Sequence, residues 1–256
     1  MGLVQDKNIL IMGVANKRSI AWAIAQALHR EGAKLAFTYQ GERFGKSVKE
    51  LTDESMPGSL LLPCDVTKEE EIQQVFSRLK EHFGVLHGVV HSLAYAKTED
   101  LEGAFLATSR DGYLLAQEIS AYSLVAVARA ARPLMTEGGS IMTMTYLGGE
   151  RVVPNYNVMG VAKAALDMSV RYLANDLGPE NIRVNAISAG PIRTLAAKGV
   201  KDFNTSLHTM QEKAPLRRGT DPAEVADTAV FLLSDMSRGV TGEVIHVDSG
   251  YHIIGM

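Results

Sequence analysis

The chain has 256 residues, of which 46% are hydrophobic and 21% charged, and its formal net charge is -3. This composition is typical of a globular protein with a sizeable core, and a slightly acidic chain without a basic stripe gives no electrostatic case for nucleic-acid binding. The single cysteine, Cys64, excludes an intramolecular disulfide, and the sequence shows neither a basic leader nor an apolar run of about 20 residues, so we expect a cytoplasmic protein without a membrane span.

Short aliphatic and β-branched runs alternate along the chain with longer segments in which apolar residues recur at helical spacing. This alternation predicts an α/β fold, in which helices cover both faces of a parallel sheet. The predicted strands cover residues 7–13, 34–39, 59–63, 86–92, 139–145, 182–188 and 242–248. Because the sequence contains no recognisable linker or internal repeat, we expect about seven strands in one doubly wound sheet and one domain spanning residues 1–256.

The first predicted strand is followed by the turn GVANKRS and by a helix that ends near Gly32. In doubly wound sheets a dinucleotide binds beyond the carboxyl ends of the strands, so this turn is a candidate cofactor site. The usual pattern G-x-G-x-x-G is missing, since the turn offers only Gly13, with Ser19 at the start of the helix. Gly13 permits close backbone approach, and Ser19 could bind a phosphate or cap the helix. A plain tight turn explains the same residues.

Side chains after the second and third strands indicate which dinucleotide is bound. An NAD enzyme commonly has an acidic residue after the second strand, and an NADP enzyme has a basic one. Gln40 stands there, and its amide can bond hydroxyl groups but cannot neutralise a 2'-phosphate. We therefore predict NADH, with NADPH less favoured although Arg43 and Lys46 are near in sequence. Asp65, after the third strand, could accept a hydrogen bond from the adenine amino group or stabilise a turn.

The next helices differ in how they are expected to pack. One is predicted at residues 67–84, with Thr67 and Glu70 as a capping box. Two longer helices, predicted at residues 110–136 and 155–177, carry small and apolar residues around much of their circumference. Because a sheet can cover only one side of a helix, we expect both long helices to pack against another subunit as well.

The segment NYNVMGVAK, at the start of the second long helix, places a phenol and an ammonium group seven residues apart. Seven residues turn a helix through about 700°, so Tyr156 and Lys163 are expected on one face, ~10.5 Å apart along the axis. They can therefore flank one bound molecule. Tyr146 ends the preceding strand. Without this context, Tyr146 could be an aromatic residue that closes the core and Lys163 an ordinary solvated residue.

Residues 189–219 form a stretch with no predicted regular structure. It is about thirty residues long, and connections of that length are usually functional, so we predict a substrate lid at about residues 190–219. The apolar residues expected beneath this lid are Leu195, Phe203, Leu207 and Met210. A helix capped by Asp221 and Glu224 follows the lid. The seven histidines show no metal-ligand spacing, and we predict no metal site.

Three segments of the chain, HSLAYA, YLGGERVVPNYNVMGVAKAALD and ISAGPIRTLAAKG, resemble the short-chain dehydrogenase/reductase superfamily. Six residues separate the tyrosine from the lysine, where the superfamily usually has three. This spacing is similar to the divergent branch, the NADH-dependent enoyl-[acyl-carrier-protein] reductases of bacterial fatty-acid synthesis, and the resemblance covers nearly the whole chain. It implies a Rossmann-like fold, a homotetramer and reduction of an enoyl thioester on its acyl-carrier protein, the last step of the elongation cycle.

The resemblance also implies roles for individual residues. Tyr156 would hydrogen-bond the thioester carbonyl oxygen, Lys163 would hold the nicotinamide ribose, and Tyr146 would line the site beside the substrate. The residues that would contact the dinucleotide are Gly13, Ser19, Ile20, Gln40, Asp65, Val66, Leu93, Lys163, Ile192, Arg193, Thr194, Leu195 and Ala196. Ala96 would lie against the acyl chain. We add three pocket-filling residues to the substrate site, namely Met159, Phe203 and Met210.

The expected chemistry explains why a phenol is needed. Hydride delivered to the β-carbon of an enoyl thioester leaves negative charge on the thioester oxygen, and losing a donor aimed at such an oxygen typically costs ~100- to 1,000-fold in rate. Two alternatives remain open. Thr143 occupies the position of the serine in ketoreductases of the superfamily, so a ketone or alcohol oxidoreductase is one alternative. The other is a module that binds NAD without turnover.

Overall fold

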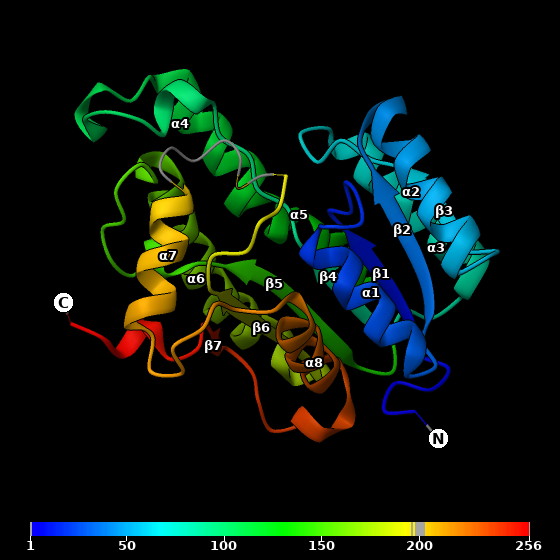
Figure 1. Cartoon of the computed structure of the whole chain (residues 1–256). Helices are drawn as coiled ribbons and strands as arrows, with labels where there is room; N and C mark the ends of the chain where they lie inside the picture. Colours follow the sequence, from blue (N-terminus) through cyan, green and yellow to red (C-terminus); the bar gives the residue numbers. More distant parts are fainter. Residues whose placement is uncertain (1, 196, 198–202, 256) are drawn as a thin grey trace.

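A parallel sheet of seven strands runs through the centre of the computed structural model (Figure 1), which describes residues 2–195, 197 and 203–255. The strands are β1 (Asn8–Met12), β2 (Lys34–Tyr39), β3 (Leu60–Pro63), β4 (Gly88–His91), β5 (Gly139–Thr145), β6 (Ile182–Ala189) and β7 (Val244–Val247). Their spatial order is β3-β2-β1-β4-β5-β6-β7, so the order reverses between β1 and β4. All seven predicted strands and the doubly wound fold are confirmed. The carboxyl ends of β1 and β4 therefore mark the crevice where ligands bind in such sheets.

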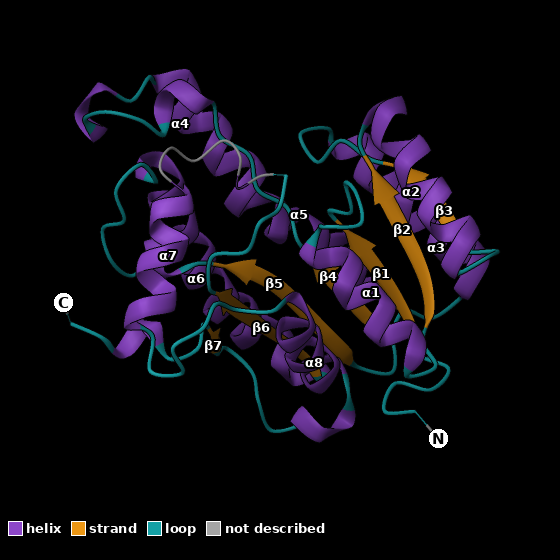
Figure 2. Ribbon diagram, viewed as in Figure 1, coloured by secondary structure: helices purple, strands orange, loops and turns teal. Residues whose placement is uncertain are grey.

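Helices cover both faces of the sheet (Figure 2). One face carries α1 (Ile20–Arg30), α2 (Gly41–Ser55) and α8 (Pro222–Leu233), and the other carries α3 (Glu69–Phe83), α5 (Ser123–Ala131) and α6 (Asn157–Leu177). Successive side chains of a strand point to opposite faces. Those of β1 therefore divide between two hydrophobic clusters, which is why this strand is apolar at nearly every position.

The long helix predicted at residues 110–136 consists of several parts. It contains α4 (Arg110–Gln117), a π-helical turn (Glu118–Tyr122) and α5, and a short 3-10 turn (Arg132–Leu134) closes it. The apolar periodicity of the sequence continues through the π-helical turn, so the sequence alone gave no sign of it. The second long helix is continuous and begins at Asn157.

One predicted helix cap is confirmed and one is wrong. At the start of α8, Asp221 and Glu224 form the predicted capping box. By contrast, α3 begins at Glu69, and the hydroxyl group of Thr67 donates to Asp65 Oδ1 at 2.8 Å. Thr67 therefore stabilises the preceding turn by donating to the Asp65 carboxylate, and Lys68 takes the N-cap position instead.

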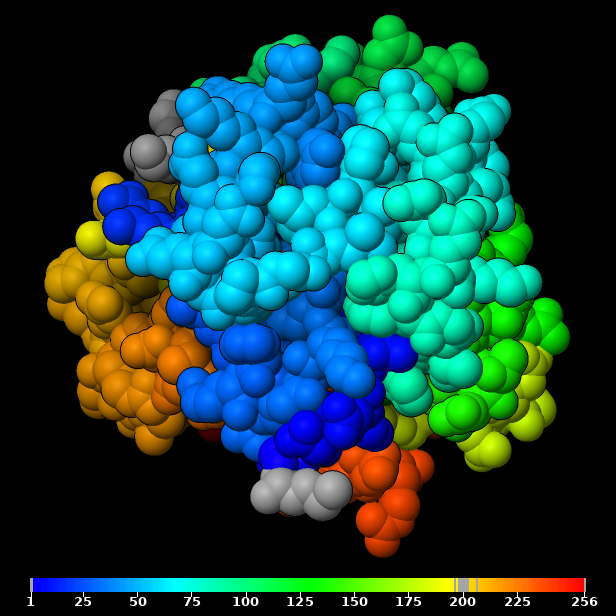
Figure 3. Space-filling view, turned by 90° about the vertical axis from the view of Figure 1, so that its right-hand side faces the viewer, coloured from blue at the N-terminus to red at the C-terminus, as the bar shows by residue number. Residues whose placement is uncertain are grey.

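The structure contains two helices that the sequence analysis did not predict. α2 buries only Val48 and Thr52, so its sequence offers few apolar residues from which a helix could be recognised. Together with α3 it makes much of the face drawn in light blue and cyan in Figure 3. α7 (Phe203–Lys213) lies within the predicted lid, which is therefore partly helical. No helix in the described part of the chain is long and apolar enough to cross a membrane.

Candidate active site

Two adjoining cavities lie at the carboxyl ends of the strands. The large cavity, of about 600 Å³, extends from the first turn of α1 to the ends of β2 and β3. The small cavity, of about 380 Å³, lies between the end of β5, the start of α6 and the segment after β6. Both volumes are typical of small-molecule sites. The residues that line both cavities are Ile20, Ala94, Tyr95, Met144, Lys163, Thr194 and Leu195. A ligand in one cavity can therefore contact a ligand in the other.

The turn before α1 forms one wall of the large cavity. Gly13 has a φ of 99°, and a Cβ atom there would overlap the carbonyl oxygen of Ser92, so a larger residue is excluded. Ser19 does not cap α1 through its side chain; its Oγ accepts hydrogen bonds from the N–H groups of Ala15 and Asn16, at 3.0 and 3.1 Å. The hydroxyl proton of Ser19 is left to donate. A hydroxyl donor beside a helix N-terminus suits an anionic group such as a phosphate.

The opposite end of the large cavity carries a negative charge. Burial acts to raise the pKa of Asp65, but hydrogen bonds from Thr67 and Gln40 hold that pKa below its ordinary value, so the carboxylate stays ionised at neutral pH. Gln40 itself is exposed and lines the cavity, whereas Arg43 and Lys46 are not among the lining residues. This end therefore favours an uncharged polyhydroxyl group over an additional phosphate.

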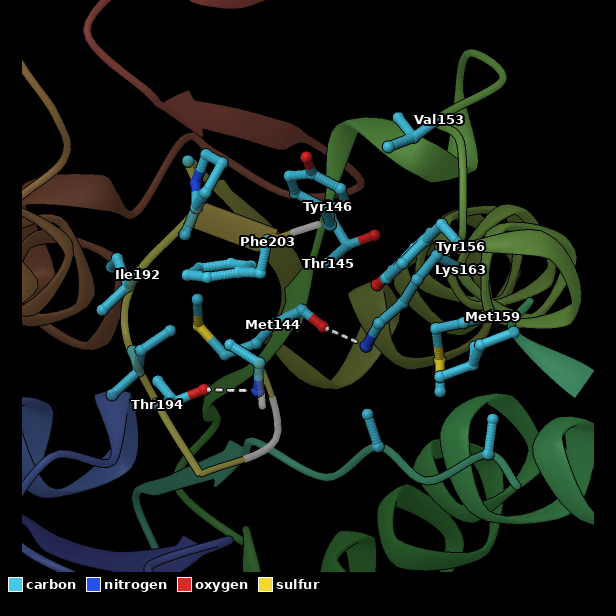
Figure 4. Close-up of a pocket in the computed structure, with 18 of the residues that line it drawn as sticks. Met144, Thr145, Tyr146, Val153, Tyr156, Met159, Lys163, Ile192, Thr194 and Phe203 are labelled. Atoms are coloured by element: carbon cyan, nitrogen blue, oxygen red, sulfur yellow. Dashed lines mark hydrogen bonds between the residues drawn. The ribbon is translucent and has the colours of Figure 1, made fainter. Parts of the chain in front are cut away.

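Tyr156 and Lys163 both border the small cavity (Figure 4). Tyr156 is the N-cap residue of α6 and Lys163 lies two turns further on, so the predicted common flank exists although Tyr156 precedes the first helical residue. Lys163 Nζ donates to the carbonyl oxygen of Met144 at 2.7 Å. Burial lowers the pKa of Lys163 to about 8, and the carboxylate of Asp167 opposes this shift. The ammonium form therefore predominates below that pH.

Tyr146 packs edge-to-face against Tyr156, with the ring centroids 5.0 Å apart and an interplanar angle of 72°. Burial raises the pKa of Tyr146 to about 12, and it raises the pKa of Tyr156 as well. Both phenols therefore keep their protons at neutral pH and serve as hydrogen-bond donors. Gly148 allows this packing, because a Cβ atom there would overlap the ring of Tyr156.

Most of the predicted site residues line one of the two cavities. The large cavity includes Gly13, Ser19, Ile20, Gln40, Asp65, Val66, Leu93, Lys163, Thr194 and Leu195. The small cavity includes Ala96, Tyr146, Tyr156, Met159, Lys163, Ile192, Thr194, Leu195 and Phe203. Ile192, which the resemblance assigned to the dinucleotide, thus lines only the small cavity.

Two predicted site residues within the described structure do not line either cavity. Arg193 is exposed. Met210, on α7, is 1% exposed, and its Cε lies against Gly190, so it packs in the protein interior and does not border the substrate site as predicted. Although α7 lies beside the cavity, the apolar Met210 side chain is buried in the interior instead of facing the cavity, because burial of an apolar side chain is favourable. Ala196 lies outside the described residues.

Thr143, the candidate for ketone chemistry, is sequestered from both cavities. It is 0% exposed, its hydroxyl donates to the carbonyl oxygen of His91 at 3.1 Å, and Nδ1 of His91 lies 2.9 Å from the same hydroxyl oxygen. The other ring nitrogen of His91 lies 2.8 Å from Ser123 Oγ. Burial and the charge of Lys163 lower the pKa of His91 to about 3, so the ring is neutral. Thr143 therefore takes part in a structural network and cannot bind a carbonyl substrate.

Cys64 lines the large cavity but is not a candidate nucleophile. It is 7% exposed, and burial raises the pKa of its thiol to about 12, so the thiolate is scarce at neutral pH. No group of His, Cys, Asp and Glu side chains suited to a metal ion exists among the residues that the structure describes.

The predicted site residues do not include Tyr95 and Thr145. Tyr95 lines both cavities and Thr145 lines the small one. Both lie at or just beyond the carboxyl end of a predicted strand, a position that the sequence alone identifies. Applying the rule for doubly wound sheets to the ends of all central strands would have found them.

Comparison with known proteins shows several full-length relatives. Residues 13–252 match the family model described as enoyl-(acyl carrier protein) reductase. The enoyl-[acyl-carrier-protein] reductase [NADH] FabI of Bacillus cereus is 65% identical over 100% of both chains. The [NADPH] FabI of Staphylococcus aureus is 57% identical over 98% of both. The chain is also similar to the solved B. cereus reductase with NADP+ and indole naphthyridinone, with a TM-score of 0.98, 64% identity and 100% of both chains covered.

Proposed function

The chain belongs to the enoyl-[acyl-carrier-protein] reductase family, and from this we infer that it reduces the trans-2 double bond of enoyl thioesters on acyl-carrier protein, the last step of fatty-acid elongation. It is an NADH-dependent oxidoreductase of the short-chain dehydrogenase/reductase superfamily. The observation that carries this conclusion for the site is that Lys163 lies where the two cavities join, with Tyr156 beside it in the small cavity.

The large cavity fits a dinucleotide. The Ser19 hydroxyl and the N-terminus of α1 are suited to the phosphates, Gln40 and Asp65 to the adenosine end, and Lys163 to the ribose at the junction. Bound NADH supplies the hydride for the substrate. NADPH is the less favoured cofactor, because the ionised Asp65 would repel its 2'-phosphate.

We assign the acyl thioester to the small cavity, with Tyr156 as the donor to its carbonyl oxygen. Reduction at the β-carbon places negative charge on that oxygen. Because burial keeps the Tyr156 phenol protonated, the phenol can donate a hydrogen bond to the charged oxygen. Tyr146 supports the Tyr156 ring through its edge-to-face contact. The ammonium group of Lys163 holds the ribose and favours Tyr156 as donor. Ala96, Met159 and Phe203 provide apolar surface for the acyl chain.

We further propose that the protein is one domain and assembles as a homotetramer. The single sheet, which takes strands from both ends of the chain, supports the first statement. Exposed apolar side chains on the outer surface of the helical layer support the second, among them Tyr122 on the π-helical turn and Met168 and Tyr172 on α6. The cytoplasmic location stays a prediction.

The test uses two substrates with the same protein. We expect NADH oxidation with a crotonyl or longer trans-2-enoyl thioester and little with the matching 3-oxoacyl thioester, because Thr143 cannot reach the cavity. Tyr156→Phe should lower kcat on the enoyl thioester by ~100-fold while leaving NADH affinity within about twofold, since only the donor to the oxygen is lost. Turnover of the 3-oxoacyl substrate alone would support the ketoreductase, and NADH binding without turnover would support the sensing module.

A further inference from the structure

Asp167 is a buried carboxylate that the reaction described above does not use. It follows Lys163 by one turn of α6, so both side chains lie on the same face of the helix. Asp167 is 8% exposed and Lys163 is 5% exposed. Gly149 approaches the same turn, since a Cβ atom at that position would lie 2.9 Å from Asp167 Oδ2 and 3.0 Å from the carbonyl carbon of Lys163. Asp167 and the backbone of Lys163 are therefore closely packed against this turn.

The carboxylate of Asp167 has unused hydrogen-bonding capacity. Asp167 Oδ1 and Thr145 Oγ1 are both buried, and neither completes a hydrogen bond with any residue the structure describes. The Thr145 hydroxyl is nevertheless close enough to act on the pKa of Asp167, which burial raises. Thr145 follows Met144, whose carbonyl oxygen accepts the hydrogen bond from Lys163. Thr145 therefore acts on the Asp167 carboxylate, which in turn acts on the charge of the Lys163 ammonium group.

The charges around Asp167 come from two elements. Lys163 and Arg171 lie on α6, and Glu150 lies in the turn after β5. Arg171 and Glu150 are both exposed, so solvent screens their charges. Lys163 is the one of these three that is buried with Asp167. A buried carboxylate without a counter-charge is costly, and the same is true of a buried ammonium group, so each stabilises the ionised form of the other.

We propose that Asp167 is a positioning residue that keeps Lys163 in its ammonium form inside the water-poor site, with the Thr145 hydroxyl group as its polar neighbour. The proposal rests on the function proposed above, because it assumes that Lys163 holds the ribose of the cofactor. Without Asp167, the amine would be neutral over more of the physiological pH range. It would then hold the ribose less firmly and would favour Tyr156 less as a donor.

The test follows NADH binding against pH, by NADH fluorescence and without any enoyl substrate. The wild-type protein should lose affinity as pH rises through about 8, where Lys163 gives up its proton. In Asp167→Asn the opposing charge is gone, so the midpoint should move about one pH unit lower. Affinity at pH 7.5 should then fall several-fold, whereas affinity at pH 6 should stay near that of the wild type.

A matched control is Asp176→Asn, which removes an exposed carboxylate from the same helix and should keep the wild-type midpoint. Asp167→Glu retains the charge and should also keep it; this variant decides the question if Asp167→Asn does not fold by circular dichroism. Lys163→Arg provides a further check, because a guanidinium group stays charged, so adding Asp167→Asn to it should no longer move the midpoint.

The proposal is overturned if Asp167→Asn binds NADH with the wild-type midpoint, or if its affinity falls equally at every pH, which indicates a purely structural role. A midpoint shift that persists in the Lys163→Arg background also overturns it. Failure of enoyl reduction with normal NADH binding would instead count against the proposed function, so the two failures are distinguishable.

Discussion

At the scale of single residues, burial determines how each ionisable group of the site behaves. It raises the pKa of Tyr146 to about 12 and lowers that of Lys163 to about 8, so the phenols keep their protons while the lysine is close to losing its own. At the other end of the site, hydrogen bonds to Asp65 keep that carboxylate ionised against the effect of burial. The site thus combines proton donors at the substrate with a negative charge at the adenosine end.

This charge distribution predicts how cofactor preference can be changed. Gln40→Arg should raise kcat/KM for NADPH relative to NADH by roughly tenfold, because a guanidinium group beside Asp65 can pair with the 2'-phosphate. Steady-state kinetics with both cofactors and one enoyl thioester would measure the ratio. Gln40→Leu is the control, since it removes the amide without adding charge. An unchanged ratio in Gln40→Arg would show that the 2'-position does not face Gln40.

At the scale of elements, the π-helical turn Glu118–Tyr122 connects the helical layer to the site. Ser120 Oγ accepts a hydrogen bond from the Tyr95 N–H at 3.0 Å and donates to the Tyr95 carbonyl oxygen at 3.1 Å. Ser123 Oγ donates to the carbonyl oxygen of Ile119 at 2.6 Å. Tyr95 and the segment around it line both cavities. By binding Tyr95, Ser120 of the π-helical turn therefore fixes the wall shared by the two cavities. π-bulges occur frequently at functional sites.

Removing the two hydrogen bonds between Ser120 and Tyr95 should affect substrate binding more than the chemical step. In Ser120→Ala we expect KM for the enoyl thioester to rise about threefold to tenfold with a smaller change in kcat, because about 1 kcal/mol of hydrogen bonding is lost at the cavity wall. Hydrogen exchange at the Tyr95 amide should become faster. Ser169→Ala is the matched control, since that hydroxyl bonds the carbonyl of Ala165 within α6. Equal effects of both variants would contradict a local role for Ser120.

At the scale of the whole molecule, the helices on one side of the sheet carry exposed apolar side chains on their outer surface. Tyr122 is 49% exposed, Met168 is 47% exposed and Tyr172 is 69% exposed. Scattered exposed apolar residues are common, but Met168 and Tyr172 are four residues apart and share one face of α6. A second copy of the chain packed on this face would bury them.

The proposed homotetramer predicts that charge on this face disrupts assembly. Replacing Met168 with Arg and Tyr172 with Glu should convert the wild-type oligomer to smaller species, because these charges would be desolvated at the interface. Size-exclusion chromatography with light scattering measures the mass. Met236→Arg, at a comparably exposed position after α8, should leave the mass unchanged. A monomeric wild-type protein at micromolar concentration would contradict the tetramer itself.

The sequence by itself determined the order and type of most elements, the capping box of α8 and the common flank of Tyr156 and Lys163. Each of these depends on residues close together in the chain, where periodicity and cap chemistry act directly. The strand ends also indicated the cavity edge, through Gln40 and Asp65.

Only the tertiary structure decided which side chains reach a ligand. Thr143 is withdrawn from the site by His91, which is 52 residues away in sequence, and Met210 is buried against Gly190. Ser19 Oγ accepts a hydrogen bond from the preceding loop. Asp167 can stabilise the charge of Lys163 because the two side chains are buried together. The physical reason is that side-chain direction and desolvation depend on neighbours from distant segments, which local sequence patterns do not specify.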